Sequence, residues 1–288
     1  MAIIKDNYSL ALLKVHGTAV LFGASGVFGA LATTGAEMIV LGRVLIAFAA
    51  LSLFFLLRRQ KLIPMQGREI ASQCLSGVLL GLGVHWVSFY QGIKIGGVAI
   101  GTLGFASFPA FVALFEMLFF KERLKTKEYF LLIAISLGLI LITPAFEFGH
   151  QATQGLLWGI FSALSYGILA VINRKNVSTI SGSQSSWCQY LVVAIMLLPF
   201  SAHQLPDVSW QDWFWIACIG LLCTTLAYTL FVSSLDTINA RTAAMIISLE
   251  PVYAIAIAWI WLDEEPSLRM LLGGALIIVS VAIVNLKK

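Results

Sequence analysis

The sequence predicts an all-α integral membrane protein of ten transmembrane helices in two inverted five-helix repeats, with both termini cytoplasmic. Three observations lead to this prediction: the composition, the spacing of apolar stretches and the distribution of positive charge. Of the 288 residues, 59% are hydrophobic and 11% are charged, and the mean hydropathy is +0.93. Soluble domains are about 25% charged and roughly 45–50% apolar. This composition therefore excludes a soluble globular fold.

Ten apolar stretches follow one another along the chain, and each is close to the ~20 residues that a helix needs to cross a membrane. Short charged or Pro-containing segments separate them, such as 58–64 and 263–266. The first stretch lacks a small-residue cleavage site, so we expect a retained helix and not a cleaved signal peptide. The predicted helices cover about 11–31, 37–57, 70–93, 95–119, 128–145, 154–173, 186–202, 211–235, 240–262 and 268–286.

Positive charge supports this count, because loops on the cytoplasmic side of a membrane are enriched in Lys and Arg. With both termini inside, fifteen of the 18 Lys and Arg residues fall on the cytoplasmic side. Lys94 and Arg269 fall outside, and Arg43 lies within a span. The net charge of +4 reflects this bias, and no nucleic-acid partner is expected. The cytoplasmic set is Lys5, Lys14, Arg58, Arg59, Lys61, Arg68, Lys121, Arg123, Lys125, Lys127, Arg174, Lys175, Arg241, Lys287 and Lys288.

An internal repeat divides the chain into a first half at 1–147 and a second half at 148–288. Each half contains an apolar helix with a proline near its middle, then a charged turn, then a final apolar helix. At an offset of 142 residues the matching pairs are Pro109 with Pro251, Glu122 with Glu264, and Phe89 with Phe231.

The two charged turns carry opposite charge, which indicates how the halves are oriented. The first turn is basic at 121–127, and the second is acidic at 263–265. Five helices per half place the first turn inside and the second outside, as the positive-inside rule requires. Inverted repeats are typical of secondary transporters, whose binding sites lie near the bilayer midplane between the repeats.

The motifs around these turns resemble the EamA repeat of the drug/metabolite transporter superfamily. The first copy contains Phe-Pro-Ala-Phe at 108–111, Phe-Lys-Glu-Arg-Leu at 120–124 and Gly138. The second contains Ala-Leu-Ser-Tyr-Gly at 163–167, Leu-Glu-Pro-Val at 249–252, Leu-Asp-Glu at 262–264, Gly273 and Ile-Ile at 277–278. The resemblance covers nearly the whole chain. It implies ten helices, a central cavity lined mainly by helices 1–4 and 6–9, and alternating access without ATP.

Glu250 is the first candidate site residue, because it lies near the middle of the ninth predicted span beside Pro251. A carboxyl group at the bilayer centre costs several kcal/mol unless it is paired, protonated or near water. It suits a proton carrier or a counter-ion for a cationic substrate, and a structural helix cap is the alternative. The first half has Phe108 at the corresponding position, so any role of Glu250 is asymmetric.

His85, Trp86 and Arg43 are further candidates. His85 titrates near neutral pH, so it can relay a proton or bind a substrate, or it can be a structural hydrogen-bonding residue. Arg43 lies six residues into the second span and can bind a carboxylate. Alternatively, Arg43 extends toward the membrane surface or pairs with Glu37.

Three mid-span tyrosines, Tyr166, Tyr228 and Tyr253, are candidates for the cavity wall. Tyr253 is three residues from Glu250, which places both on one helix face. Aromatic rings hold cations through their faces. Packing within the helix bundle is the alternative.

Other classes of function are weakly supported. Gly-Ala-Ser-Gly at 23–26 resembles the nucleophile segment of intramembrane serine proteases, but a packing face of small residues explains it more simply. No Walker-type loop occurs, and the four cysteines form no CxxC pair, so neither ATP drive nor a metal site nor another cofactor is expected.

The sequence therefore predicts a multi-pass transporter of the cell membrane, in bacteria the inner membrane. The favoured function is export of small metabolites such as amino acids by alternating access, with Glu250 meeting an ammonium group or a proton and Arg43 a carboxylate. Two alternatives remain open: an organic-cation exporter with Glu250 as counter-ion, and facilitated exchange without proton coupling. The expected partners are a small-molecule substrate and the lipid bilayer, and the oligomeric state is not predicted.

Overall fold

The computed structural model describes residues 2–81, 84–121, 123–124, 126–143, 149–175, 180–234, 237–238, 243 and 246–286. Within these residues the chain is helical and contains no β-strand. Among the described residues, six helical segments are long and apolar enough to cross a membrane: Asn7–Leu31, Ala36–Leu57, Val98–Phe120, Gln151–Ile172, Gly182–Asp207 and Trp210–Ser234. The prediction of an all-α membrane protein is confirmed at this level.

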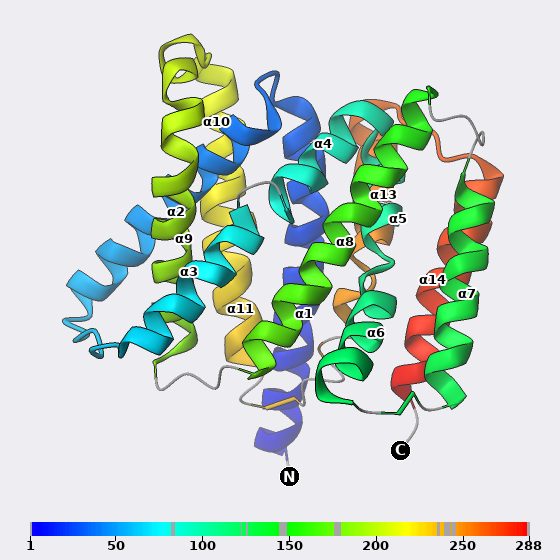
Figure 1. Cartoon of the computed structure of the whole chain (residues 1–288), viewed down its shortest axis with the longest axis horizontal. Coiled ribbons are helices and arrows are strands. Elements are labelled where there is room, and N and C mark those ends of the chain that lie inside the picture. The colour runs from blue at the N-terminus through cyan, green and yellow to red at the C-terminus, as the bar shows by residue number, and fades with distance from the viewer. Residues whose placement is uncertain are drawn as a thin grey trace.

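The helices follow the order of the predicted spans (Figure 1). Three of the spans are interrupted: α3 and α4, α5 and α6, and α10, η2 and α11 each share one predicted apolar stretch. The segment η2 is a π-helix. The helices are α1 (Ala2–Leu31), α2 (Ala36–Leu57), α3 (Gly67–Gly81), α4 (Trp86–Gly96), α5 (Val98–Phe105), α6 (Phe108–Phe120), α7 (Thr126–Ile142), α8 (Gln151–Lys175), α9 (Gly182–Ser201), η1 (Ala202–Asp207), α10 (Trp210–Cys218), η2 (Ile219–Leu226), α11 (Ala227–Ser234), α13 (Glu250–Leu262) and α14 (Leu268–Leu286).

The break between α5 and α6 has a local cause. Pro109 has no backbone N–H, and it lies in the first turn of α6, where that N–H would have no partner within the helix. At the end of α5, the Gly104 carbonyl accepts a hydrogen bond from the Ser107 hydroxyl at 2.7 Å. The predicted span at 95–119 is therefore two short helices joined by a tight turn.

The local geometry of this region recurs at the predicted offset. Both α6 and α13 have 13 residues, and Pro109 and Pro251 lie in the first turn of each. Lys121 and Asp263 end the two helices in the left-handed conformation, with φ of 55° and 53°. The turn after α6 lies at the end of the molecule where α1 begins, and the turn after α13 lies at the opposite end (Figure 1).

The N-terminal end of α1 and the C-terminal end of α14 also lie at one end of the bundle (Figure 1). An even number of spans requires this arrangement, although the count of ten and the cytoplasmic position of the termini stay predictions. Several residues used in those predictions lie outside the described residues, namely Glu122, Lys125, Arg241, Lys287 and Lys288.

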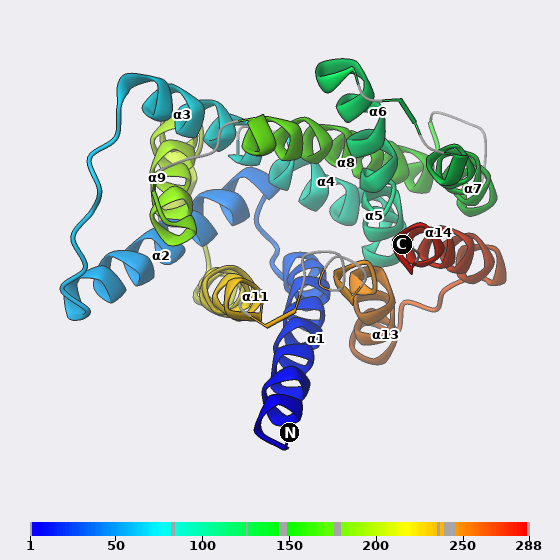
Figure 2. The same cartoon turned by 90° about the horizontal axis from the view of Figure 1, so that it is seen from below.

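Seen along the bundle, α7 and α14 lie together at one edge, and α2, α3 and α9 lie at the opposite edge (Figure 2). Small residues allow the closest approaches. A Cβ on Gly138 of α7 would lie 3.0 Å from the Gly273 carbonyl of α14, and one on Gly273 would lie 2.8 Å from the Gly138 carbonyl. Gly104 of α5 approaches Gly159 of α8 in the same way. These contacts fit membrane helix packing, in which glycine lets two backbones touch.

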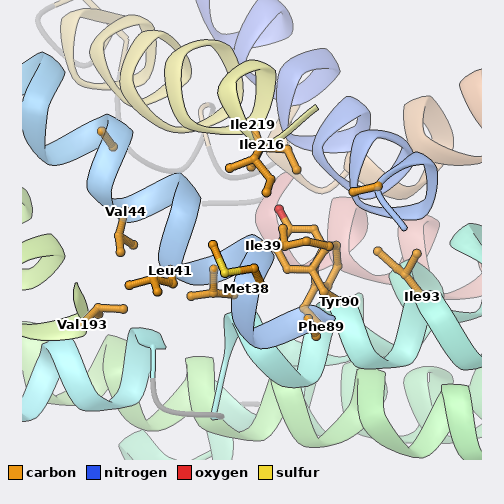
Figure 3. Packing of buried hydrophobic residues seen from close by; sticks show 14 of the residues in the cluster. Met38, Ile39, Leu41, Val44, Phe89, Tyr90, Ile93, Val193, Ile216 and Ile219 are labelled. Atoms are coloured by element: carbon orange, nitrogen blue, oxygen red, sulfur yellow. The ribbon is translucent and has the colours of Figure 1, made fainter. Parts of the chain in front are cut away.

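A core of fully buried side chains joins α2, α4 and the helices around η2 (Figure 3). Met38 and Ile39 of α2 pack with Tyr90 of α4, and Ile216 and Ile219 cover them from the other side. Many outward-facing apolar side chains elsewhere are exposed, for example Leu118 and Ile260. Such a surface suits a lipid environment, because lipid makes outward-facing apolar residues favourable.

Candidate functional site

A cavity of about 330 Å³ lies among the helices. Its lining comes from α1, α2, α5, α6, α8, α9, η2 and α11, and from the N-terminal ends of α4 and α13. Among the described residues, neither α7 nor α14 contributes to it. The lining residues are Phe22, Ser25, Arg43, His85, Trp86, Phe89, Phe105, Phe108, Tyr166, Leu169, Gly182, Ser185, Ser186, Gln189, Tyr190, Cys223, Thr224, Tyr228, Ile247 and Glu250.

Arg43 is buried and held in place by neutral groups. Its Nε and Nη2 donate to the Thr224 hydroxyl at 3.1 and 2.8 Å, and its Nη1 donates to the Tyr90 hydroxyl at 3.0 Å. Three of its five N–H groups are used in this way. No carboxylate among the described residues forms an ion pair with it, and Arg43 is 5% exposed. The side chain therefore neither extends to the protein surface nor pairs with Glu37, and two N–H groups remain for a ligand.

The π-helix η2 positions Thr224 for this role. The Thr224 hydroxyl donates to the Ile219 carbonyl at 2.8 Å, five residues earlier, so its lone pairs can accept both N–H groups of Arg43. Gly220 permits the approach, since a Cβ there would lie 3.0 Å from the Arg43 carbonyl. Short π-helical segments are often found at functional sites.

Trp86 stacks on the same guanidinium group. The Arg43 Cζ lies 4.0 Å from the Trp86 ring centroid, which is a cation–π contact. Behind Arg43, Tyr90 also bonds Ser25 through its hydroxyl at 2.7 Å. Ser25 is the serine of the protease-like segment, and its hydroxyl partner here is this tyrosine.

Glu250 begins α13 and lines the cavity. Its carboxylate has no hydrogen-bond or ion-pair partner within the described part of the chain. The close approach of α1 fixes its backbone, because a Cβ on Gly23 would lie 2.9 Å from the Glu250 carbonyl oxygen. An unpaired carboxyl group in an apolar bundle is costly, so a proton, water or a ligand must satisfy it.

His85 precedes α4 and is held from two sides. Its Nδ1 lies 2.9 Å from the Ser162 hydroxyl, and the same hydroxyl donates to the His85 carbonyl at 2.8 Å. The rings of Phe105 and Tyr166 each lie 5.0 Å from the imidazole, measured between centroids. The predicted residues His85, Trp86, Tyr166, Tyr228, Arg43 and Glu250 thus line one cavity.

Tyr253 is the exception among the predicted residues. It does not line the cavity, and its hydroxyl lies 3.1 Å from Nδ1 of His16 on α1. Helix side chains point toward the N-terminus of their helix. The Tyr253 ring packs against Val15 and Ala19 of α1 and not into the cavity, although the sequence spacing puts it on the face of Glu250.

A polar wall on α9 was not predicted from the sequence. The Gln189 amide nitrogen donates to the Gln73 side-chain oxygen at 2.9 Å, and Ser185 donates to the same oxygen at 2.8 Å. Ser185 and Gln189 both line the cavity, as does Cys223. A polar residue every fourth position on one helix face, at 185 and 189, was the available signal.

The family model described as the EamA-like transporter family matches residues 9–143 and 153–286. Among curated proteins, the chain is similar to "Uncharacterized transporter YxxF" of Bacillus subtilis (strain 168), with 24% identity over 100% of this chain and 93% of that protein. An uncharacterized transporter of Archaeoglobus fulgidus is 28% identical over 71% of this chain and 75% of its own length.

A third relative is named for the compound it exports. "Pseudopaline exporter CntI" of Pseudomonas aeruginosa (strain UCBPP-PA14) is 24% identical over 82% of this chain and 82% of that protein. One solved crystal structure is similar with a TM-score of 0.67 and 16% identity, covering 96% of this chain and 97% of that chain, which shows the fold alone. Two family matches that together cover nearly the whole chain establish that this multi-pass membrane protein belongs to the EamA-like transporter family.

Proposed function

We propose that the chain is a secondary active transporter that exports amino acids or similar small zwitterions by alternating access. The observation that carries the proposal is the pairing of two opposite charges in one cavity. Arg43 has N–H groups free for a carboxylate, and Glu250 has an unpaired carboxylate for an ammonium group. A zwitterion satisfies both charges at once and leaves no net charge buried.

The scaffold supports alternating access. The repeated turns after α6 and α13 lie at opposite ends of the molecule, as two inverted five-helix halves require (Figure 1). The similarity to a named exporter supports outward transport. Glu250 would carry a proton in one step of the cycle and release it when the ammonium group binds.

Proton flux in proteoliposomes tests the proposal. Purified protein is reconstituted with a pH-sensitive dye inside, and amino acids, polyamines, quaternary amines and nucleobases are added one class at a time. We expect amino acids to move protons through the native protein and not through the Glu250→Gln variant, which keeps the shape of the side chain but cannot ionise.

Two results would contradict parts of this mechanism. Exchange of amino acids without proton movement in either protein would remove the coupling role of Glu250 and favour facilitated exchange. Absence of amino-acid transport, with transport of quaternary amines instead, would contradict the zwitterion proposal.

The second candidate is an organic-cation exporter. It is favoured by the aromatic rings of Phe108 and Tyr166, which line the cavity together with Glu250, their centroids 5.2 Å apart. An Arg43→Ala variant separates the two candidates. Loss of zwitterion transport alone supports the first, whereas unchanged transport of every substrate would exclude a substrate-binding role of Arg43.

A further inference from the structure

The hydrogen bonds around His85 fix which ring nitrogen carries its proton. The Ser162 hydroxyl has one hydrogen and contacts both the His85 carbonyl, at 2.8 Å, and Nδ1, at 2.9 Å. The His85 carbonyl also accepts from the Phe89 N–H at 2.9 Å. Two oxygens 2.8 Å apart repel each other unless a hydrogen lies between them, so the Ser162 hydroxyl donates to the carbonyl. Ser162 must then accept from Nδ1, which therefore carries a hydrogen.

The other ring nitrogen, Nε2, belongs to a side chain that lines the cavity. Among the described residues, the side-chain hydrogen bond of this ring involves Nδ1. In the same part of the chain, the one fully buried side-chain N or O atom without a partner is Ser201 Oγ. Nε2 is therefore not sealed in the protein, and His85 lines the cavity. In the neutral ring, Nε2 is a hydrogen-bond acceptor with no hydrogen of its own.

The surroundings restrict what can bind there. Trp86 contacts both Arg43, with Cζ at 4.0 Å from its centroid, and the His85 ring, at 6.2 Å between centroids. A second positive charge, either on the imidazole or on a ligand group beside it, would be repelled by Arg43 in a weakly polar site. Phe105 and Tyr166 flank the imidazole at 5.0 Å and offer apolar walls for a flat group.

From this geometry we propose that His85 selects a substrate whose side chain carries a neutral N–H or O–H donor on a flat apolar ring, and that Ser162 is its positioning residue. The inference rests on the proposed function: Arg43 and Glu250 would hold the zwitterionic end, and His85 Nε2 would accept from the side chain. The substrate class is thus a zwitterion with a ring-borne neutral donor.

A pair of nearly isosteric probes tests the acceptor. L-tryptophan has an indole N–H, and L-3-benzothienylalanine has sulfur in its place and donates nothing. Both probes compete against radiolabelled L-tryptophan bound to the purified native protein. We expect unlabelled L-tryptophan to compete about tenfold better than L-3-benzothienylalanine, because a ligand without the N–H leaves a buried acceptor unpaired. Equal competition by the two probes would overturn the proposal.

Two substitutions locate the effect at Nε2. His85→Asn keeps an amide near the Nδ1 position, facing Ser162, but puts no polar atom at Nε2. The ratio of the apparent affinities for L-tryptophan and L-3-benzothienylalanine should therefore fall to nearly one. His85→Gln puts an amide near the Nε2 position, so part of the preference should return. A tenfold preference that survives in His85→Asn would overturn the assignment.

Ser162 is tested by the same ratio against a matched control. Ser162→Ala frees the imidazole to adopt its other tautomer and should lower the preference several-fold, and Ser162→Thr should restore it. Ser165→Ala removes a hydroxyl of the same helix that donates to the Ser162 carbonyl at 3.0 Å and does not contact His85, so it should leave the ratio unchanged. Equal effects of Ser162→Ala and Ser165→Ala would contradict a positioning role.

Transport of L-leucine, which has no side-chain donor, separates this inference from the proposed function. If native proteoliposomes exchange L-leucine while the two ring probes compete equally, the proposed function stands and the role of His85 is wrong. If neither L-leucine nor L-tryptophan binds or is exchanged, the amino-acid function itself fails, and the inference fails with it.

Discussion

Thr224 shows how a neutral side chain can fix the position of a charge. It accepts from two nitrogens of Arg43 while its own hydrogen is used by the backbone. A Thr224→Val variant keeps the shape and removes the acceptor, so it should weaken zwitterion binding by about 1–3 kcal/mol, as expected when buried N–H groups lose their partner. Equilibrium binding to the purified protein measures this loss.

The matched control for Thr224 lies one residue along the same π-helix. The Thr225 hydroxyl also donates to a carbonyl five residues earlier, at Gly220, at 2.9 Å, but it does not contact Arg43. Thr225→Val should therefore bind zwitterions as the native protein does. An equal loss in both variants would mean that the hydroxyls stabilise the π-helix and that Arg43 needs no acceptor.

At the residue scale, the sequence identified the charged members of the cavity wall and three of its aromatic residues, Trp86, Tyr166 and Tyr228. It missed several other aromatic residues and the neutral polar groups. Arg43, His85 and Glu250 are conspicuous because ionisable groups in apolar spans are costly. Thr224 and Gln189 are not, since a single polar residue in a long helix is compatible with many neighbours. Spacing along α9 marks a polar face at 185 and 189, but the partners of Gln189 and Thr224 depend on which helices meet, and no single helix shows that.

At the element scale, Gly23 permits the close contact of α1 with α13. A Cβ on Gly23 would lie 2.7 Å from the Ala254 nitrogen and 2.9 Å from the Glu250 carbonyl oxygen. Gly23→Ala must therefore separate the helices beside the cavity. We expect a loss of about 1–3 kcal/mol of stability from overpacking, measured as a lower melting temperature in detergent, together with weaker substrate binding.

Gly17 is the control on the same helix. A Cβ there meets its nearest atom, in the Leu230 side chain, at 3.8 Å, which is ordinary contact. Because alanine favours a helix over glycine by up to about 1 kcal/mol, Gly17→Ala should be neutral or slightly stabilising. If both variants melted alike, helix propensity and not the α1–α13 contact would decide the result.

The turn after α13 is tied to the start of α5 by Glu264. Its carboxylate accepts from the backbone N–H groups of Val98 and Ala99 at 2.9 and 2.8 Å, where α5 has free donors and a partial positive charge. Glu264→Gln removes the charge and one acceptor, and should cost about 0.5–2 kcal/mol of stability. Thermal melting compares this variant with Glu265→Gln, which changes an exposed neighbour and should have no effect. A similar loss of stability in Glu265→Gln would exclude the capping role of Glu264.

At the scale of the whole molecule, hydropathy predicted an all-helical membrane chain because the bilayer imposes the length and composition of its helices. The count of ten and the orientation inferred from charge stay predictions. The interruptions within the predicted spans were harder to predict from the sequence. Pro109 marked the break before α6, but the π-helix at 219–226 has no proline or glycine pair that would mark it. Such departures from α-helical geometry depend on contacts with neighbouring helices, which lie far away in the sequence.

The inverted arrangement makes a prediction about the membrane itself. Lys121 and Asp263 end helices of equal length in the same left-handed conformation, yet their turns lie at opposite ends of the bundle (Figure 1). The basic turn should face the cytoplasm and the acidic turn the outside. In a Cys74→Ser background, which removes the exposed native thiol, an impermeant maleimide should label the Asp263→Cys variant in intact cells and the Lys121→Cys variant only after permeabilisation. Labelling of both from the same side would mean that the two halves are not inverted, and alternating access through a pair of inverted repeats would no longer describe this transporter.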